Sequence, residues 1–438
     1  MLVANSGSDD ARVVKEAESL AAAGHEVRVL CLSKAHAPAI ETRNGVTFER
    51  CSEPHRRGFR GRVQPSVGPT APRARTPRGP RGSVYSRALA TLKAAVGPFV
   101  QHEINTLTFT RAAARLAPDI IHAHDFEVLS AAVRAARACG ARVVYDMHEL
   151  EEGRLPAPSA LARWWKARIE RRALAEVAAT LTVSPSIARL KAAQHDIPLP
   201  AVVLNAPRRA PGGVRQPDLR ARCGLDADIP LAVYVGTVAE GRGVETLLEA
   251  LAGLQDMHLA ILGTVRPAMA PVLDRFQRSP AGLRLHLLSP VPHDEVVSHI
   301  ASADLGVCTI PGTCQNYELC LPNKLFEMTL AGLPLLVSTT TELSRFVAET
   351  CTGIAVDATR AESIAAGLAA VYANRKRLRP SPAALADLTR RFSWETQAAR
   401  LIDLYEAVLR IPAGMPARMA RNSLAGRVLP TTALASEL

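Results

Sequence analysis

The sequence predicts an α/β protein made of two doubly wound domains, each a parallel sheet with helices on both faces. Short apolar runs alternate with stretches of helical period along most of the chain, which is typical of this architecture. The 438 residues also exceed what one hydrophobic core usually supports. A segment rich in Pro, Gly and Arg from Arg208 to Gln216 separates the two expected domains, 1–207 and 217–392.

The amino-acid composition indicates where the protein is located and what kind of partner it binds. Eight cysteines are scattered without a C-x-x-C pair, which argues against a zinc ribbon or a disulfide framework and favours a cytoplasmic location. No run approaches the ~20 apolar residues of a membrane span, and the N-terminus lacks the regions of a signal peptide. The net charge is +12, from 53 basic and 41 acidic residues, which favours anionic partners.

The N-terminal domain begins with a strand–helix–strand unit. Leu2–Asn5 is expected to be a very short first strand, followed by a polar turn and a helix from about residue 11 to 23. Gly24 ends that helix, and the next strand runs over 27–31. Asn5 and Gly7 lie in the turn after the first strand, so they are either part of a plain connecting turn or face a ligand.

A long segment, about 51–83, is not expected to contribute to a core. It holds eight Arg and no acidic residue between Pro54 and Gly82, with many Pro and Gly. Two interpretations stay open: a contact with an anionic membrane or phosphorylated acceptor, and a solvated loop without a partner. Nucleic-acid binding is not expected, because the interleaved aromatics needed for base stacking are missing.

Two later strands end in histidine and carboxylate side chains. One runs over 119–125 and ends in His124 and Asp125; the other runs over 142–149 and ends in His148 and Glu149. Ligands bind beyond the carboxyl ends of parallel strands, so this edge is a candidate site. Zinc ligation by His122, His124, His148 and carboxylates is conceivable, but alternation along the strand places His122 more simply in the interior.

The segment 160–180 is expected to form a long helix containing Trp164 and Trp165 among many Arg and Lys. Such a helix either lies on a membrane or packs with a solvated basic face.

The C-terminal domain opens with a buried strand over 230–237 and a Gly-rich turn. Gly236, Thr237, Arg242 and Gly243 surround a turn that feeds a helix, which is suited to a diphosphate. The turn is not a P-loop, because Arg242 and Gly243 replace the Lys-Ser/Thr pair that holds the phosphates and Mg²⁺.

The stretch Leu321–Ser338 is predicted to be a helix followed by a buried strand. Pro322 suits the first turn and Gly332 ends the helix. Asn323, Lys324 and Glu327 are polar residues near the start of a helix that is otherwise apolar. Lys324 and Glu327 are either an ordinary surface pair, with ~0.2–0.5 kcal/mol of stabilisation, or groups that bind a phosphate and sugar hydroxyls.

The Pro-Asn-Lys-Leu-Phe-Glu segment, followed by Ala-Gly-Leu-Pro, resembles the donor-sugar motif of GT-B glycosyltransferases of the retaining family 4 type. The resemblance extends from Asn5 to about Leu409. It implies two Rossmann-like domains facing a central cleft, and a helix over 393–410 that crosses back to the first domain. The tail over 411–438 is expected to be disordered.

The resemblance also implies a function and residue roles. A sugar would move from a nucleotide-diphosphate donor to a glycan or lipid-linked acceptor hydroxyl, without metal or cofactor, in polysaccharide or cell-envelope assembly. His148 and Glu149 would be catalytic. The donor would contact the Gly236–Gly243 turn and the helix start that includes Asn323, Lys324, Leu325 and Glu327. The acceptor side would include Asn5, Gly7, His124 and Asp125.

Two positions depart from the family pattern. Thr237 stands where the family has an Arg, and Leu319 stands where the first of two Glu residues would fall. These departures motivate the alternative, a non-catalytic GT-B-like subunit that binds a partner or a membrane surface.

Overall fold

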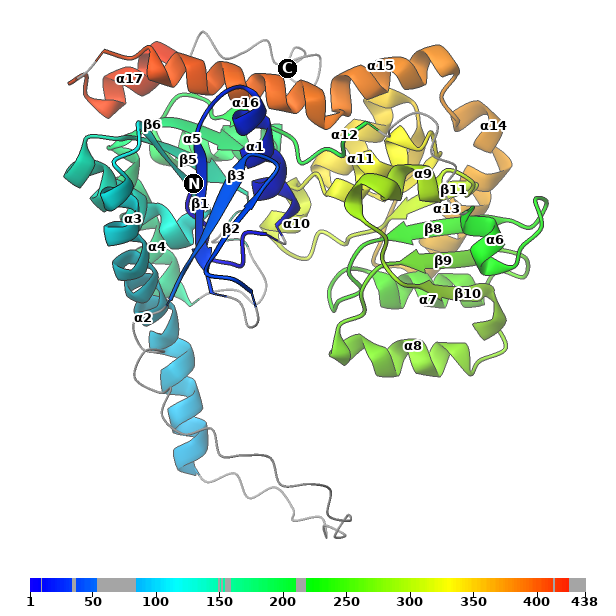
Figure 1. The fold of residues 1–438 in the computed structure, drawn as a ribbon. Helices are drawn as coiled ribbons and strands as arrows, with labels where there is room; N and C mark the ends of the chain where they lie inside the picture. The colour runs from blue at the N-terminus through cyan, green and yellow to red at the C-terminus, as the bar shows by residue number, and fades with distance from the viewer. Residues whose placement is uncertain are drawn as a thin grey trace. The chain divides into compact units, whose positions relative to one another are not determined.

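The computed structural model describes residues 1–8, 10–33, 37–52, 84–148, 150, 153, 159–209, 218–412 and 414–424. The chain divides into two compact units (Figure 1). The first unit comprises Met1–Asp146, Pro158–Ala178 and Pro416–Arg418; the second comprises Met147–Ala157, Ala179–Met415 and Met419–Leu438. The Arg-rich segment over 53–83 lies outside the described residues, so the expectations for it stay untested.

The first unit begins with a small sheet of order β1-β3-β2. Strand β1 (Val27–Leu32) pairs in parallel with β3 (Val46–Cys51), and β2 (Ile40–Arg43) pairs antiparallel to β3. Asn44 (φ 49°) and Gly45 (φ 77°) connect β2 to β3, the pair of residues that a type I′ hairpin turn favours. The expected first strand is reduced to Leu2, which bridges Leu30 and Ala123.

A second sheet has the order β4-β5-β6-β7. Its strands are β4 (Ile120–His124), β5 (Arg142–Met147), β6 (Val177–Thr182) and β7 (Ala201–Val202). The accompanying helices are α1 (Ala11–Ala22), α2 (Val84–Leu116), α3 (Phe126–Cys139), α4 (Ala160–Leu174) and α5 (Pro185–His195). The helix expected over 160–180 therefore ends at Leu174, because the residues from Val177 onward form a fully buried strand.

The second unit contains a six-stranded parallel sheet of order β10-β9-β8-β11-β12-β13. The strands are β8 (Leu231–Val235), β9 (His258–Leu262), β10 (Leu285–Leu288), β11 (Leu305–Cys308), β12 (Leu335–Ser338) and β13 (Gly353–Val356). With its strands numbered in chain order, this sheet has the order 3-2-1-4-5-6, that of a doubly wound sheet whose ligand site lies where the order reverses. That switch point lies between β8 and β11.

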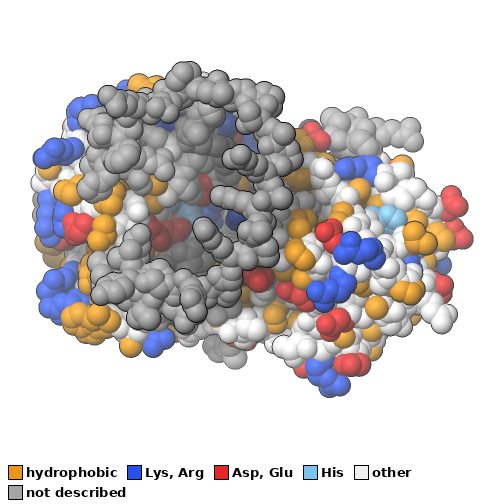
Figure 2. Space-filling view, turned by 90° about the horizontal axis from the view of Figure 1, so that it is seen from below, with side chains coloured by type: hydrophobic (Ala, Val, Ile, Leu, Met, Phe, Trp, Pro, Cys, Tyr) orange, Lys and Arg blue, Asp and Glu red, His pale blue; other side chains and the backbone are white. Residues whose placement is uncertain are grey.

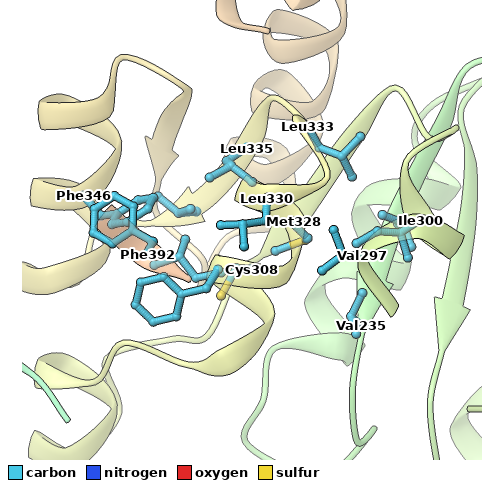
Figure 3. Packing of buried hydrophobic residues seen from close by; sticks show 14 of the residues in the cluster. Val235, Val297, Ile300, Cys308, Met328, Leu330, Leu333, Leu335, Phe346 and Phe392 are labelled. Atoms are coloured by element: carbon cyan, nitrogen blue, oxygen red, sulfur yellow. The ribbon is translucent and has the colours of Figure 1, made fainter. Parts of the chain in front are cut away.

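Both faces of this sheet are buried. Val233 of β8 belongs to one apolar cluster, while Ala232 and Tyr234 belong to another, as expected for side chains that alternate across a strand. Figure 3 shows the first cluster, in which Phe346 and Phe392 pack with ring centroids 5.0 Å apart.

The helices of this unit begin with α6 (Leu219–Cys223), α7 (Val244–Ala252), α8 (Ala270–Gln277), α9 (Val296–Ile300), α10 (Gln315–Leu319) and α11 (Asn323–Leu330). They continue with α12 (Thr341–Thr350), α13 (Ala361–Ala373), α14 (Arg375–Leu378), α15 (Pro382–Phe392) and α16 (Trp394–Leu409). Short 3-10 turns cover Pro267–Met269, Gly282–Arg284 and His293–Glu295.

The tail over 411–438 was predicted to be disordered; its described part contains a helix, while 425–438 lie outside the described residues. This helix, α17 (Ala417–Leu424), buries Ala420 and Leu424, which provides the apolar contacts that order it. Before it, Trp394 at the start of α16 packs against Val203, and Gln397 accepts a hydrogen bond from the Leu204 amide at 3.1 Å. Within the part of the chain that the structure describes, none of the helices has the length and apolar content that crossing a bilayer requires.

Candidate functional site

The Gly-rich turn after β8 lies at the switch point of the second unit. Gly236 has φ 106° and Gly243 has φ 76°, a region that favours glycine. A Cβ on Gly243 would lie 2.2 Å from the Thr309 carbonyl oxygen, so only glycine fits this close approach to the segment after β11. Gly243 is also the N-cap residue of α7. Because glycine has no side chain, it cannot accept a hydrogen bond from the first amides of α7.

Lys324 on the first turn of α11 is a buried cation at the same switch point. Its side chain is 5% exposed, and its Nζ lies 3.6 Å from the centre of the Tyr234 ring. A Cβ on Gly236 would lie 3.9 Å from Lys324 Cε, which places the lysine chain beside the Gly-rich turn. Among the described residues, Nζ has no hydrogen-bond partner.

A buried ammonium without an acceptor is costly unless an anion can approach it. The cation–π contact with Tyr234 compensates for part of this cost, by about 2 kcal/mol at a desolvated site. The remaining hydrogen-bonding capacity of Nζ suits an anionic ligand. Tyr234 itself donates a hydrogen bond to the Thr237 carbonyl at 3.2 Å, which ties the ring to the turn.

Arg242 lies in the same electrostatic neighbourhood as Lys324. Burial raises the pKa of Cys308 to about 11, and Lys324 and Arg242 both oppose that rise. Burial likewise raises the pKa of Cys320 to about 12, again opposed by Arg242 and Lys324. Arg242 directly precedes Gly243, which approaches the Thr309 backbone just after β11, and Lys324 lies beside Gly236 just after β8, so both cations are carried at the carboxyl end of the sheet.

The other predicted donor residues differ in placement. Glu327 is buried at 7% exposure on α11, and Asn323 is half-buried at its start. The side chain of Leu325 is fully buried in the apolar cluster that contains Phe346 and Phe392, so only its backbone is available to a ligand. The Thr237 hydroxyl lies 3.3 Å from that of Thr264.

Glu318, next to the departure at Leu319, serves the fold. Its Oε1 accepts hydrogen bonds from the Thr341 amide at 2.9 Å and the Thr341 hydroxyl at 2.7 Å, at the start of α12. The carboxylate is therefore engaged at a helix start rather than free for a sugar.

His148 directly follows β5 and is half-buried, whereas Glu149 lies outside the described residues. The chain after His148 belongs to the second unit and contacts α10 within it. The Leu150 amide donates to Asn316 Oδ1 at 2.9 Å, and a Cβ on Gly153 would lie 3.0 Å from that of Gln315. Asn316 thus helps to fix the segment that presents His148.

In the first unit, a buried charged cluster underlies the carboxyl ends of β4 and β5. It contains Arg12 and Glu16 of α1, His122 and His124 of β4, and Asp146 of β5, each at most 2% exposed. Arg12 holds Asp146 in a bidentate pair, with Nε–Oδ2 at 2.8 Å and Nη2–Oδ1 at 3.1 Å. Burial alone would lower the pKa of Arg12, but Asp146 and Glu16 outweigh it and raise that pKa.

Four members of this cluster could in principle hold a metal, because ligand atoms of Glu16, His122, His124 and Asp146 lie within 4.8 Å of one another. However, Arg12 Nε lies 3.0 Å from Glu16 Oε1 and 2.8 Å from Asp146 Oδ2. The guanidinium therefore lies between the two carboxylates and supplies the positive charge there. These residues fit an internal ion pair better than a metal site.

Of the predicted acceptor-side residues, His124 belongs to this cluster and Asp125 directly follows it at the end of β4, whereas Asn5 and Gly7 lie in the turn before α1. Asn5 Nδ2 donates to Asp10 Oδ2 at 2.8 Å, and the Gly7 amide donates to Asn5 Oδ1 at 2.7 Å. His124 is buried, with Nδ1 3.6 Å from Asp146 Oδ2. Asp125 is half-buried with φ 65° and ψ 172°, a strained backbone for a residue with a side chain, and its amide donates to the Asp146 carbonyl.

Sequence reasoning did not identify Arg12, Glu16 or Tyr234. A signal for Glu16 was present, because it falls with Val13, Ala17 and Leu20 on the apolar face of α1. No local signal links Tyr234 to Lys324, which lies 90 positions later in the chain.

Comparison with known proteins agrees with this fold. One family model, described as a glycosyl transferase 4-like domain, matches residues 10–207, and another, described as glycosyl transferases group 1, matches residues 229–374. A D-inositol 3-phosphate glycosyltransferase of Xylanimonas cellulosilytica is 26% identical over 315 residues, covering 67% of this chain and 73% of the relative.

Two solved structures share the fold over nearly the whole chain. Sucrose-phosphate synthase from Thermosynechococcus elongatus has a TM-score of 0.69 at 17% identity, with 94% of this chain and 98% of that chain covered. Anabaena HepE, solved in complex with UDP and glucose, has a TM-score of 0.60 at 13% identity, with 92% and 98% covered.

Proposed function

Because this chain belongs to the GT-B glycosyltransferases of the family 4 type, which transfer sugars from nucleotide donors, we propose that it does so with retention at the anomeric carbon. The donor diphosphate binds in the second unit, between the Gly236–Gly243 turn and the start of α11. The acceptor binds through the N-terminal domain, 1–207, and the donor through the C-terminal domain, 217–392, as the sequence predicts. No metal or cofactor takes part.

The observation that carries the donor site is the Lys324 ammonium, which is buried without a hydrogen-bond partner among the described residues. Together with Arg242 and the uncapped start of α7, it supplies positive charge where the departing diphosphate gains negative charge. Thr237 removes one cation that the family pattern has, and Lys324 offsets that loss. Gly236 and Gly243 allow the phosphates to approach the backbone.

The remaining residues take roles around the sugar. Glu327 and Asn323 bind hydroxyls of the donor, and Leu325 contributes backbone. His148 contacts the donor sugar near the reacting carbon, and Glu149 orients it. Asn5, Gly7, His124 and Asp125 form the acceptor side, where the strained backbone of Asp125 supports a functional role.

The acceptor is a hydroxyl on a glycan, a lipid-linked sugar or a polyol phosphate. The last of these is suggested by the relative named for D-inositol 3-phosphate. A role in polysaccharide or cell-envelope assembly is the setting we propose for the first two.

The test is turnover of a panel of UDP-, GDP-, ADP- and dTDP-sugars with acceptors from these three classes. One donor should give product, or slow hydrolysis without acceptor. Lys324→Ala and Arg242→Ala should each lower turnover by about 10²–10³-fold, the cost of one lost charge-stabilising donor. The exposed Lys376→Ala is the control and should leave turnover unchanged.

Unchanged turnover in both site variants would contradict the donor site. If no donor were turned over or hydrolysed, the chain would instead be the non-catalytic GT-B-like subunit that Thr237 and Leu319 suggest.

A further inference from the structure

Helix α4 presents one continuous face of mixed apolar and basic residues to solvent. Leu161 and Trp164 are 63% and 60% exposed, and Arg168, Arg171 and Arg172 are exposed as well. These five residues follow each other at intervals of three, four, three and one, so they share one stripe of the helix. The apolar pair lies near the start of the helix and the three Arg lie toward its end.

The exposure of Trp164 is specific, because its neighbour Trp165 points inward. The Trp165 ring packs on Phe99, His102 and Phe126, with centroids 4.5, 5.0 and 5.9 Å away. The contact recorded for the Trp164 ring is with Arg168, whose guanidinium carbon lies 5.8 Å from the ring centre. The helix thus has a packed aromatic side and a separate aromatic residue on its free side.

The charge of the exposed face is uncompensated on the helix itself. Glu170 is the only acidic residue of α4, and it is 4% exposed and accepts a hydrogen bond from the Tyr145 hydroxyl at 2.9 Å. Arg168, Arg171 and Arg172 have no carboxylate partner among the described residues, whereas Arg137 of α3 pairs with Glu176. Figure 2 shows Lys and Arg side chains beside hydrophobic ones at its left margin, the side on which α2, α3 and α4 lie in Figure 1.

We propose that this α4 face binds the surface of an anionic lipid bilayer. Trp164 and Leu161 insert at the headgroup level while the three Arg contact lipid phosphates, as in other helices that lie in the membrane interface. A basic face that only contacts water does not account for an exposed Trp and an exposed Leu one turn apart. The proposal does not depend on the donor site, because binding to lipid needs neither nucleotide nor turnover.

The test is flotation of the full chain with vesicles of phosphatidylcholine, alone or with about one third phosphatidylglycerol. Binding should require the anionic lipid and fall with salt. Arg168, Arg171 and Arg172 all changed to Gln should weaken partitioning on the order of 100-fold, about fivefold per residue. Arg275, Arg278 and Arg377 all changed to Gln remove the same charge from exposed sites of the second unit and should have little effect.

Tryptophan fluorescence supplies a second readout. Trp394 is buried and Trp165 half-buried, so Trp164 should give most of the emission change on anionic vesicles, and Trp164→Phe should remove most of that change. The proposal is overturned if both triple variants bind vesicles equally, or if the α4 variants lose affinity for a DNA duplex while vesicle binding is unaltered. Activity on a soluble acceptor should be the same in all the variants.

Discussion

Lys324 and Arg12 are both buried cations, but their charges are balanced differently. Arg12 contacts two carboxylates within the fold, whereas the Lys324 ammonium rests on the Tyr234 ring without a hydrogen-bond partner among the described residues. The first arrangement is complete without a ligand, and the second becomes complete when an anion binds. Removing each residue should therefore have opposite consequences.

Replacing Arg12 by Met should lower the free energy of unfolding by about 3–5 kcal/mol, because Asp146 and Glu16 would stay buried without their cation. Chemical denaturation measures this change. Arg28→Met is the control: its pair with Glu26 is exposed, with side chains 45% and 79% accessible, and should matter by less than about 1 kcal/mol. Equal effects of the two substitutions would refute the cluster's structural role.

The same cluster predicts a pH dependence. Burial, reinforced by the neighbouring His124, lowers the pKa of His122 well below 6.5. The unfolded chain therefore binds a proton that the folded chain does not, so stability is complete above pH 6.5 and declines as the pH falls below it. Thermal unfolding from pH 7.5 to 5 should show a smaller decline for His122→Gln than for the wild type, by at most about 1.4 kcal/mol per pH unit.

At the scale of elements, the strands were easier to predict than the ends of helices. The runs that became β5, β8 and β12 are apolar and bounded by polar residues, so burial alone located them. The end of α4 was missed because its pattern continues into β6 without Gly or Pro. The β2–β3 hairpin carries a local Asn44-Gly45 signal that a pattern of strand–helix–strand units does not include. Helix α17 buries Ala420, Arg421 and Leu424 on one face, a helical spacing that the Pro, Gly and Arg around it obscure.

The Gly-rich turn makes a prediction at this scale. Gly243→Ala should destabilise the protein by about 1–3 kcal/mol, since φ is 76° and the new Cβ would meet the Thr309 carbonyl. Gly253→Ala, at the other end of α7, has φ −76° and no contact closer than 3.5 Å. It should be neutral or stabilise by up to about 1 kcal/mol. Comparable losses in both would mean that the turn is not constrained as described.

At the scale of the molecule, the sequence predicted the fold class and the residues at strand ends, because both follow from parallel-sheet topology. Lys324 and Arg242 could be found as well, because each lies in a segment that directly follows a strand of the parallel sheet or starts a helix there. The partners of these residues could not, since Tyr234 and Lys324, or Arg12 and Asp146, meet only once the chain has folded. The position of the charges on the surface could not be predicted either, because a net charge of +12 does not show that three Arg lie on one face of α4.

The most direct measurement of the central claim is calorimetric titration of nucleoside diphosphates into the wild type and Lys324→Met. We expect at least one of UDP, GDP, ADP and dTDP to bind, and the variant to bind it at least about tenfold more weakly, the loss of one charged hydrogen bond. The free variant should be no less stable than the wild type, because a buried ammonium has been removed. Equal affinity of the two proteins for the diphosphate would contradict the account.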